Sequence, residues 1–299
     1  MKPPILFLIF NRPDLTNKVF TEIKKQKPTQ LFIAADGPRK DNPGEEEICK
    51  QTRQLVLNAI DWECDVKTRF QHENLGCGKA VSSAIDWFFE NVDEGIILED
   101  DCLPDQTFFT FCTELLQYYR NDDKVMHISG NNFQLGQIRG EGSYYFSRYA
   151  YIWGWATWKR AWMKYDFNLQ RYRKCSTEGL SKSLIRYLHS IHNKEIDTWD
   201  FQWFFAVWFN KGKAINPQVN LVKNIGYGVS GSHTRRVSWW LKKMTYGKLV
   251  TIVHPYNKEI NIIADKYVSD KIFTNSFILN FSKKIYRGIF YKRRKYSST

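Results

Sequence analysis

Short apolar segments alternate with amphipathic segments through the first 130 residues, and this alternation constrains the fold more than any other feature. Residues 4–10 and 30–37 are apolar runs bounded by turn residues, which is typical of buried strands in a parallel sheet. Between them, apolar residues recur every four positions after Pro13, which predicts a helix. The unit repeats until five strands and four helices are expected. We therefore predict a doubly wound, mostly parallel α/β sheet, in which ligands bind at the carboxyl ends of the strands.

The second half of the chain has a different composition. Residues 144–165 are crowded with aromatic side chains, and helical periodicity returns near residues 179–192 and 197–210. No segment rich in Pro, Gly or Ser divides the chain, so this half is interpreted as an elaboration of the same sheet. We expect one domain over residues 1–240. The first half of this domain is expected at residues 1–130 and the second half at residues 131–240. A basic extension is expected at residues 241–299.

Three consecutive acids, Glu99, Asp100 and Asp101, follow an apolar run at the end of a predicted central strand. Adjacent carboxylates repel one another unless a cation holds them. Mn²⁺ or Mg²⁺ would suit these oxygen ligands, because such ions take one or two carboxylates together with phosphate oxygens and water. The alternative is that the acids cap the next helix or pair with surface Lys and Arg. Asp105 is the better helix cap, which leaves the triplet in need of another partner.

The net charge of +13 is concentrated near the C-terminus, because no acid follows Asp270 whereas eight Lys and Arg residues do. Apolar residues in this tail recur at helical intervals, at Ile278, Phe281, Ile285 and Ile289. The pattern predicts an interfacial helix on an anionic membrane surface. A solvated basic end and a nucleic-acid-binding tail are the alternatives.

Targeting signals and cysteine usage favour the cytoplasm. The early apolar run is too short for a signal peptide or a membrane span, and no later stretch reaches eighteen apolar residues. The six cysteines are dispersed, without C-x-x-C pairs or zinc-like spacing, which fits a reducing compartment. We expect a cytoplasmic protein that the basic tail holds peripherally on the inner face of the cell membrane.

An ordered series of motifs resembles a known family. The segment ILEDDCLPD is preceded by strands that end in NR and ADG and is followed by YIWGWATWKRAW. This series is similar to the GT-A class of nucleotide-sugar glycosyltransferases, and most similar to the inverting N-acetylglucosaminyltransferase I type and to bacterial relatives in surface-polysaccharide clusters. The resemblance covers residues 4–235 and implies a GT-A fold.

The resemblance implies roles for residues on the donor side. Asn11 and Arg12 would lie by the phosphates or the base, and Asp36 would accept hydrogen bonds from uracil or ribose. A surface ion pair for Arg12 and an Asp-Gly turn at Asp36 are the alternatives. Lys79, with two neighbouring glycines at a helix start, would neutralise the diphosphate; a simple helix-entry turn is the alternative there.

Metal ligation is implied for the acidic triplet and for one loop histidine. Asp101 would coordinate the ion, whereas Asp100 and Glu99 would lie on the nucleotide-sugar side. His233, in YGVSGSHT, corresponds to a loop histidine that binds metal or phosphate in many GT-A proteins. This loop carries an extra Gly-Ser before the histidine, and a surface histidine is the alternative.

The resemblance places the base and the acceptor site in the second half. Inversion at the anomeric carbon needs a base for the attacking hydroxyl. A Trp-Asp segment carries the base in the family, which implies Asp200, with Asp197 as the reserve; a helix N-terminal acid is the alternative for each. Trp153 and Trp155, in WGWATW, would stack on the acceptor, although both also fit a structural core.

The sequence therefore predicts a metal-dependent, inverting glycosyltransferase that uses Mn²⁺ or Mg²⁺. Its donor would be a nucleotide diphosphate sugar, expected to be a UDP-sugar, and its acceptor a hydroxyl of a glycan or a lipid-linked saccharide in surface polysaccharide synthesis. A sugar nucleotidyltransferase would share the fold, but NRPDL lacks the glycine-rich loop that such an enzyme needs after its first strand. A basic nucleic-acid-binding protein would explain the charge without explaining the acids, so we expect no nucleic-acid partner.

Overall fold

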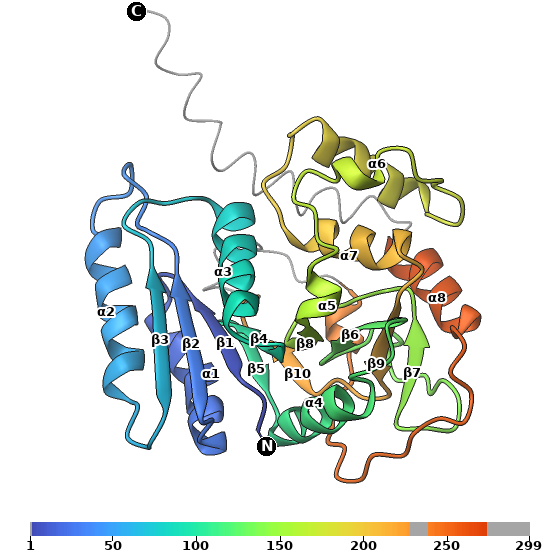
Figure 1. Ribbon diagram of the computed structural model, residues 1–299, viewed down its shortest axis with the longest axis horizontal. Helices are drawn as coiled ribbons and strands as arrows, with labels where there is room; N and C mark the ends of the chain where they lie inside the picture. The colour runs from blue at the N-terminus through green and yellow to red at the C-terminus, as the bar shows by residue number, and fades with distance from the viewer. Residues whose placement is uncertain (1, 228–238, 274–299) are drawn as a thin grey trace, which may run out of the picture.

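The computed structural model describes residues 2–227 and 239–273, and its centre is one mixed sheet flanked by helices (Figure 1). The eight strands of this sheet have the order β3-β2-β1-β4-β8-β6-β9-β7. Their bounds are β1 (Ile5–Ile9), β2 (Gln30–Ala35), β3 (Asp65–Phe70), β4 (Glu94–Glu99), β6 (Val125–Ser129), β7 (Tyr144–Ser147), β8 (Trp155–Trp158) and β9 (Lys213–Pro217). A two-stranded sheet pairs β5 (Cys102–Pro104) with β10 (Val222–Asn224).

Six of the described helices occur where the apolar periodicity predicts them, whereas α5 and α8 were not predicted. Their bounds are α1 (Pro13–Gln26), α2 (Glu45–Asn58), α3 (Cys77–Asn91), α4 (Gln106–Tyr118), α5 (Lys159–Trp162), α6 (Lys182–His192), α7 (Asp200–Phe209) and α8 (Ile262–Val268). Short turns of helix are η1 (Gln170–Tyr172), η2 (Leu241–Lys243) and η3 (Ser269–Phe273). Asp105 is the N-cap of α4 as expected, because its side chain accepts a hydrogen bond of 2.9 Å from the backbone N–H of Thr107.

The predicted α/β class is confirmed, and two antiparallel strands are added to it, β8 inside the sheet and β7 at its edge. Strands β1, β2, β3 and β4 pair in parallel, and β6 pairs in parallel with β9. Strand β8, from the aromatic stretch, lies antiparallel between β4 and β6. Strand β8 therefore joins the parallel strands β3-β2-β1-β4 to the parallel pair β6-β9, and it is not adjacent in sequence to either of its neighbours.

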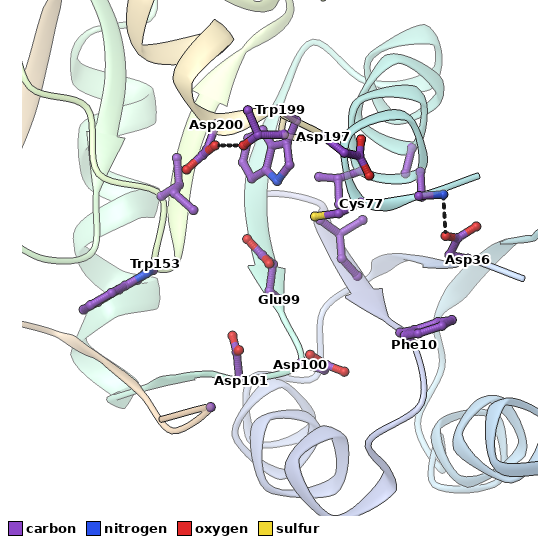
Figure 2. Close-up of a pocket in the computed structure, with 18 of the residues that line it drawn as sticks. Phe10, Asp36, Cys77, Glu99, Asp100, Asp101, Trp153, Asp197, Trp199 and Asp200 are labelled. Atoms are coloured by element: carbon purple, nitrogen blue, oxygen red, sulfur yellow. Dashed lines mark hydrogen bonds between the residues drawn. The ribbon is translucent and has the colours of Figure 1, made fainter. Parts of the chain in front are cut away.

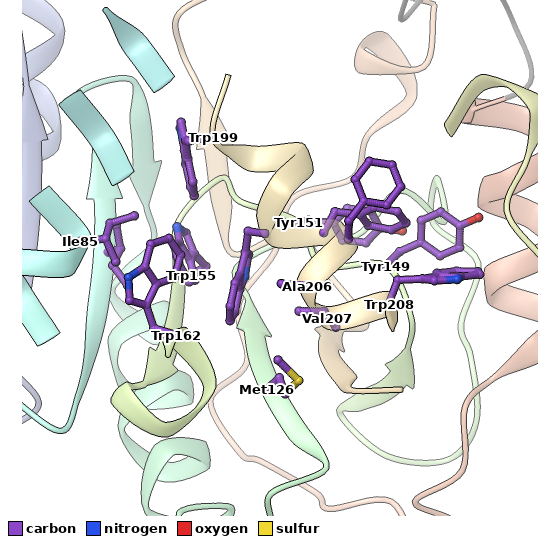
Figure 3. Close-up of a cluster of buried hydrophobic side chains, with 14 of the residues drawn as sticks. Ile85, Met126, Tyr149, Tyr151, Trp155, Trp162, Trp199, Ala206, Val207 and Trp208 are labelled. Atoms are coloured by element: carbon purple, nitrogen blue, oxygen red, sulfur yellow. The ribbon is translucent and has the colours of Figure 1, made fainter. Parts of the chain in front are cut away.

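Each face of the sheet is covered by its own set of helices. Leu6 and Leu8 of β1 belong to a core with α3, α5, α6 and α7, whereas Ile5, Phe7 and Ile9 belong to a core with α1, α2 and α4. This division follows from the alternation of side chains along a strand. The first core is rich in tryptophan and tyrosine (Figure 3). Aromatic side chains fill the space between the sheet and α7.

Part of the expected C-terminal extension belongs to the fold, so the boundary at residue 240 is not a boundary of packing. Within residues 241–273, Ile260 bridges to Phe146 of β7, whereas Leu249 bonds Thr107 of α4. The carboxylate of Asp265 accepts a hydrogen bond of 2.5 Å from the Ser147 hydroxyl. The apolar stripe expected after residue 273 lies outside the described residues. None of the described helices is long and apolar enough to span a bilayer.

Candidate active site

A cavity of about 820 Å³ opens at the carboxyl ends of β1, β2 and β4 (Figure 2). One wall is built by the residues that follow these strands, and it carries most of the charge. The other wall comes from the second half of the chain, and it is mostly aromatic. The cavity lies where α/β sheets bind their ligands.

The acidic triplet is balanced by Arg12, which the chain itself supplies. Arg12 follows β1 and bonds Asp100 through two nitrogens, one of them Nε at 3.3 Å from Oδ2. Its Nη1 lies 3.0 Å from Asp101 Oδ2. Only 24% of the Arg12 side chain is exposed, so this is not the surface ion pair considered as the alternative. Arg12 and its two partners form one charged cluster in the wall of the cavity.

Burial raises the pKa values of two members of the triplet. The pKa of Glu99 is well above its usual range, because the side chain is buried and Asp101 and Asp100 lie nearby. Its Oε1 is buried and has no hydrogen-bond partner in the described part of the chain. Burial also raises the pKa of Asp100 to about 6, although Arg12 opposes this shift. The raised pKa values mean that Arg12 alone does not stabilise three ionised carboxylates at this place.

The donor set of this cluster fits a divalent cation. Within residues 2–227 and 239–273, no three His, Cys, Asp or Glu side chains are arranged to hold a metal by themselves. Mg²⁺ and Mn²⁺ do not require three, since substrate phosphates and water complete their coordination. The unpartnered Glu99 oxygen and the carboxylates that Arg12 alone does not stabilise both favour an added cation. His233, the other expected ligand, lies outside the described residues.

Asp36 lies in the cavity wall and is held by the loop that precedes α3. Its two carboxylate oxygens accept bonds from the backbone N–H groups of Leu75 at 2.9 Å and Gly76 at 3.2 Å, and from the Asn74 amide at 2.9 Å. Burial raises the pKa of Asp36, against the effect of these bonds. Asp36 thus ties β2 to the start of α3, and its contact with a nucleotide stays a prediction.

Asn11 is oriented by a buried acid that the sequence reading did not single out. The Asn11 amide donates a hydrogen bond of 2.7 Å to Glu45 Oε1, and Arg39 pairs with the same carboxylate. Burial alone would raise the pKa of Glu45, but the bonds from Arg39 hold it at about 2. The sequence does not identify Glu45 as a buried acid, because it is one of three consecutive glutamates at the start of α2. Only tertiary packing distinguishes it from the other two.

The N-terminus of α3 is contacted by the side chain of Asp197. Asp197 Oδ1 accepts a hydrogen bond of 3.0 Å from the backbone N–H of Gly78. A Cβ atom at Gly76 would lie 2.6 Å from Asp197 Oδ2, so glycine there allows the carboxylate to approach. Lys79 is exposed and does not line the cavity. Asp197 thus accepts a hydrogen bond at the start of α3, and the expected role of Lys79 at a diphosphate stays a prediction.

Asp200 faces the cavity from the first turn of α7. Its Oδ1 accepts a hydrogen bond from the Thr198 hydroxyl. Burial raises the pKa of Asp200, against the effect of that bond. A carboxylate with a raised pKa in an aromatic setting is chemically suited to accept a proton.

The two expected acceptor tryptophans have different surroundings. Trp153 lines the cavity, and its ring stacks on Trp240 with a centroid distance of 6.0 Å. Trp155 is fully buried in β8 and stacks on Trp199 at 5.8 Å. Trp155 is therefore a core residue and cannot touch a ligand in the cavity. Strand alternation would place residues 153 and 155 on the same face, but Trp153 precedes β8 and Gly154 between them has a φ of +64°, which breaks the extended backbone.

Several solved structures are similar to part of this chain, each at low sequence identity. No family model matches the chain, and no curated protein matches it. A solved mannosyltransferase, PcManGT from Pyrobaculum calidifontis in complex with GDP-Man and Mn²⁺, has a TM-score of 0.43 and 11% identity over 73% of this chain and 55% of its own. The structure of S. aureus TarS 1-349 has a TM-score of 0.44 and 10% identity, over 74% of this chain and 59% of its own.

A UDP-glucose pyrophosphorylase complexed with UDP-glucose has a TM-score of 0.44 and 10% identity, over 81% of this chain and 97% of its own. The chain therefore spans little more than half the length of the first two structures. The names of these structures describe different reactions, since one is a mannosyltransferase and another a pyrophosphorylase. At such low similarity, the chemistry of the cavity has to be inferred from its own residues.

Proposed function

We propose that this protein is a metal-dependent, inverting glycosyltransferase that moves a sugar from a UDP-sugar to an acceptor hydroxyl. The observation that carries the proposal is the placement of Asp200 and the acidic triplet on different walls of one cavity (Figure 2). A donor held at the triplet would present its anomeric carbon to an acceptor held beside Asp200. Sugar transfer needs both sites in one space.

Asp101 is the described residue that would hold the divalent ion, with Asp100 and Glu99 beside it on the nucleotide-sugar side. When bound, the ion supplies Lewis-acid stabilisation of the departing diphosphate. Arg12 already neutralises part of the charge on these carboxylates, and its guanidinium can also bind phosphate oxygens. Arg12 therefore links the acidic cluster to the phosphates of the donor.

Asp200 is proposed as the base. The acceptor oxygen forms a bond to the anomeric carbon, while the bond from that carbon to the diphosphate oxygen breaks. The hydroxyl proton moves to the Asp200 carboxylate, and the electron pair of the broken bond leaves with the nucleoside diphosphate. The raised pKa of Asp200 makes the carboxylate a stronger proton acceptor than a solvated one.

The cellular setting of the proposal follows from two features. All six cysteines are free, as expected in the reducing cytoplasm. The basic tail, whose sequence predicts an interfacial helix, would keep the enzyme at the inner face of the membrane, where precursors of surface polysaccharides are assembled.

The test is a hydrolysis and binding screen of nucleotide sugars with Mn²⁺. We expect Asp101→Asn to lose Mn²⁺-dependent UDP binding. We expect Asp200→Asn to keep this binding and to lose turnover by about 10²- to 10⁴-fold. Asp61→Asn is the matched control, since Asp61 is a surface acid paired with Lys24 outside the cavity. Full activity in either cavity variant would remove that residue from its proposed role.

A sugar nucleotidyltransferase is the second candidate, and its products distinguish it. Such an enzyme would release pyrophosphate from a nucleoside triphosphate and a sugar phosphate, whereas the proposed enzyme releases UDP. The structure disfavours this candidate, because only residues 10–12 separate β1 from α1 and none of them is glycine. So short a turn cannot wrap around a triphosphate. Pyrophosphate release in the screen would reverse this preference.

A further inference from the structure

The cavity continues past Asp200 into a region bounded by α6, α7 and η3, which we call the apolar arm. Its residues are Tyr187, Phe201, Phe204, Ile272 and Phe273. Tyr187 and Phe201 stack with a centroid distance of 4.0 Å. The rings of Phe204 and Phe273 both pack against Tyr149, with centroid distances of 5.5 Å and 5.3 Å. The arm is therefore an apolar lining drawn from three separate elements, in which Tyr187, Phe204 and Ile272 are 1%, 5% and 4% exposed and present only small edges to the cavity.

The apolar arm begins directly at the proposed base. Asp200 and Phe204 are four residues apart on α7, so they lie on the same face of the helix. Phe201 follows Asp200 in the first turn and also lines the cavity. An acceptor whose hydroxyl reaches Asp200 must place its neighbouring atoms against these rings.

The chemistry of the arm differs from that of a sugar site. The charged residues that line the cavity belong to its other parts, at Arg12, Arg39, Arg69, Asp36, Glu99, Asp100, Asp101, Asp197 and Asp200. Sugar hydroxyls placed in the arm would lose bonds to water without charged partners among the described lining residues. An alkyl chain loses no such bonds, and each buried methylene raises its affinity about fourfold.

The surface beside the arm has the character expected near a membrane. η3 carries Ile272 on the cavity side, whereas Lys271 lines a second surface pocket with Ile262, Ile263 and Lys266, the last paired with Asp270 at 3.1 Å. The two isoleucines at the start of α8 are 76% and 72% exposed. Exposed apolar side chains among lysines suit the boundary of an anionic bilayer, where lipid-linked molecules are found.

We propose that the apolar arm binds the lipid portion of a lipid-linked acceptor, next to the hydroxyl that Asp200 deprotonates. This inference rests on the proposed function, because it takes the polar part of the cavity as the donor site. It selects a lipid-linked saccharide over a free glycan as the acceptor. The apolar chain, by filling the arm, positions the acceptor sugar between Asp200 and the donor.

The test uses the full chain and n-alkyl glucosides from butyl to decyl, each below its critical micelle concentration. Binding is followed by tryptophan fluorescence in the presence of UDP and Mn²⁺. We expect Kd to fall about fourfold with each added methylene until the arm is filled. Binding that is weak and equal across the series would overturn the inference, whether the arm is too narrow or is filled by residues of the chain after 273.

Two variants assign the effect to the arm. Phe204→Gln makes the arm polar, and Ile272→Phe fills it. In each variant we expect the Kd of the longer glucosides to rise by tenfold or more, at about fourfold for each methylene that the arm no longer accepts. The dependence of Kd on chain length should therefore become flatter. Tyr256→Gln is the matched control, since Tyr256 is an exposed aromatic residue outside the cavity. An unchanged chain-length dependence in both arm variants would also overturn the inference.

Donor binding separates this inference from the proposed function. UDP and Mn²⁺ contact the polar part of the cavity, so their affinity should stay within about twofold of wild type in both variants. If the wild-type protein does not bind UDP and Mn²⁺, the glycosyltransferase proposal itself is contradicted. Retained donor binding without chain-length dependence would contradict only the lipid assignment.

Discussion

The two walls of the cavity are organised in opposite ways. On the wall at the ends of β1, β2 and β4, charged groups hold one another, as Arg12 holds Asp100 and Asp101. On the wall from the second half, aromatic rings pack against one another, as Trp153 does against Trp240. Ion pairs can exchange partners with an incoming ion or phosphate, whereas packed rings keep their shape. The first wall is thus suited to ligand exchange, and the second to a fixed acceptor geometry.

The largest effect on stability is expected on the charged wall. Arg12→Ala leaves the 3% exposed Asp100 without its cation, so we expect the free energy of unfolding to fall by about 3–5 kcal/mol. Saturating Mn²⁺ should restore more stability to this variant than to wild type, because the ion binds the same carboxylates. Urea unfolding with and without Mn²⁺ measures both effects.

Lys24→Ala is the control for Arg12→Ala, since Lys24 forms an exposed pair with Asp61 and should contribute less than about 1 kcal/mol. Equal responses of wild type and Arg12→Ala to Mn²⁺ would show that Arg12 and the ion do not share ligands. The comparison of the two walls would then lose its basis.

The aromatic wall should instead be sensitive to acid. His127 is fully buried behind it, where Trp203 Nε1 donates to His127 Nδ1 at 3.0 Å, and burial lowers the pKa of His127 to about 3. An unfolded histidine binds a proton near pH 6.5, so the unfolded state holds more protons between pH 6.5 and pH 3. His127 therefore removes about 2 kcal/mol of stability as the pH falls from 7 to 5.

Comparison with His127→Gln isolates this titration, because the carboxylates of the charged wall titrate in both proteins. Wild type should lose about 2 kcal/mol more than the variant between pH 7 and pH 5 in urea unfolding. Parallel pH profiles would mean that His127 is accessible to protons in the folded protein. The aromatic wall would then be less tightly packed than the structure indicates.

A smaller effect is expected where the two walls meet. Asp197→Ala removes the acceptor at the N-terminus of α3 and should lower the free energy of unfolding by about 1 kcal/mol. Turnover should stay within about threefold of wild type, since the carboxylate is already used by the Gly78 N–H. A loss of turnover as large as that of Asp200→Asn, without loss of stability, would instead make Asp197 the base.

The smallest effect is expected at Lys79. Because its side chain is exposed and does not line the cavity, Lys79→Ala should change the Kd for UDP by less than about twofold. Isothermal calorimetry with UDP and Mn²⁺ measures this directly. A loss of tenfold or more would show that the charged wall extends to the start of α3 when a donor binds.

Much of the fold could be predicted because its signals are local. The strands and helices of the first 130 residues follow from apolar periodicity, and the cap at Asp105 follows from its position after Pro104. The antiparallel placement of β8 could not be predicted, because a strand carries no mark of the neighbour that it pairs with. The packing of residues 241–273 against β7 and α4 was missed for the same reason.

The site could be predicted in its residue types and less well in its partnerships. The triplet, Asp200 and Trp153 all line one cavity, and the roles that the resemblance implies for them stay predictions. Trp155 and Lys79 do not line it, because the φ of +64° at Gly154 separates Trp155 from Trp153, and Lys79 lies on the exposed face of α3. Pattern alone does not resolve that difference.

The sequence by itself determined that strands and helices alternate and that acids stand at the end of a central strand, since periodicity and adjacency are properties of the chain. Only the tertiary structure decided that Arg12 meets those acids and that Asp197 closes the start of α3, contacts that span 88 and 119 positions along the chain. Such contacts depend on how the layers of the fold are brought together. Charge pairs and ring stacks act only over a few ångströms, and the fold sets those distances.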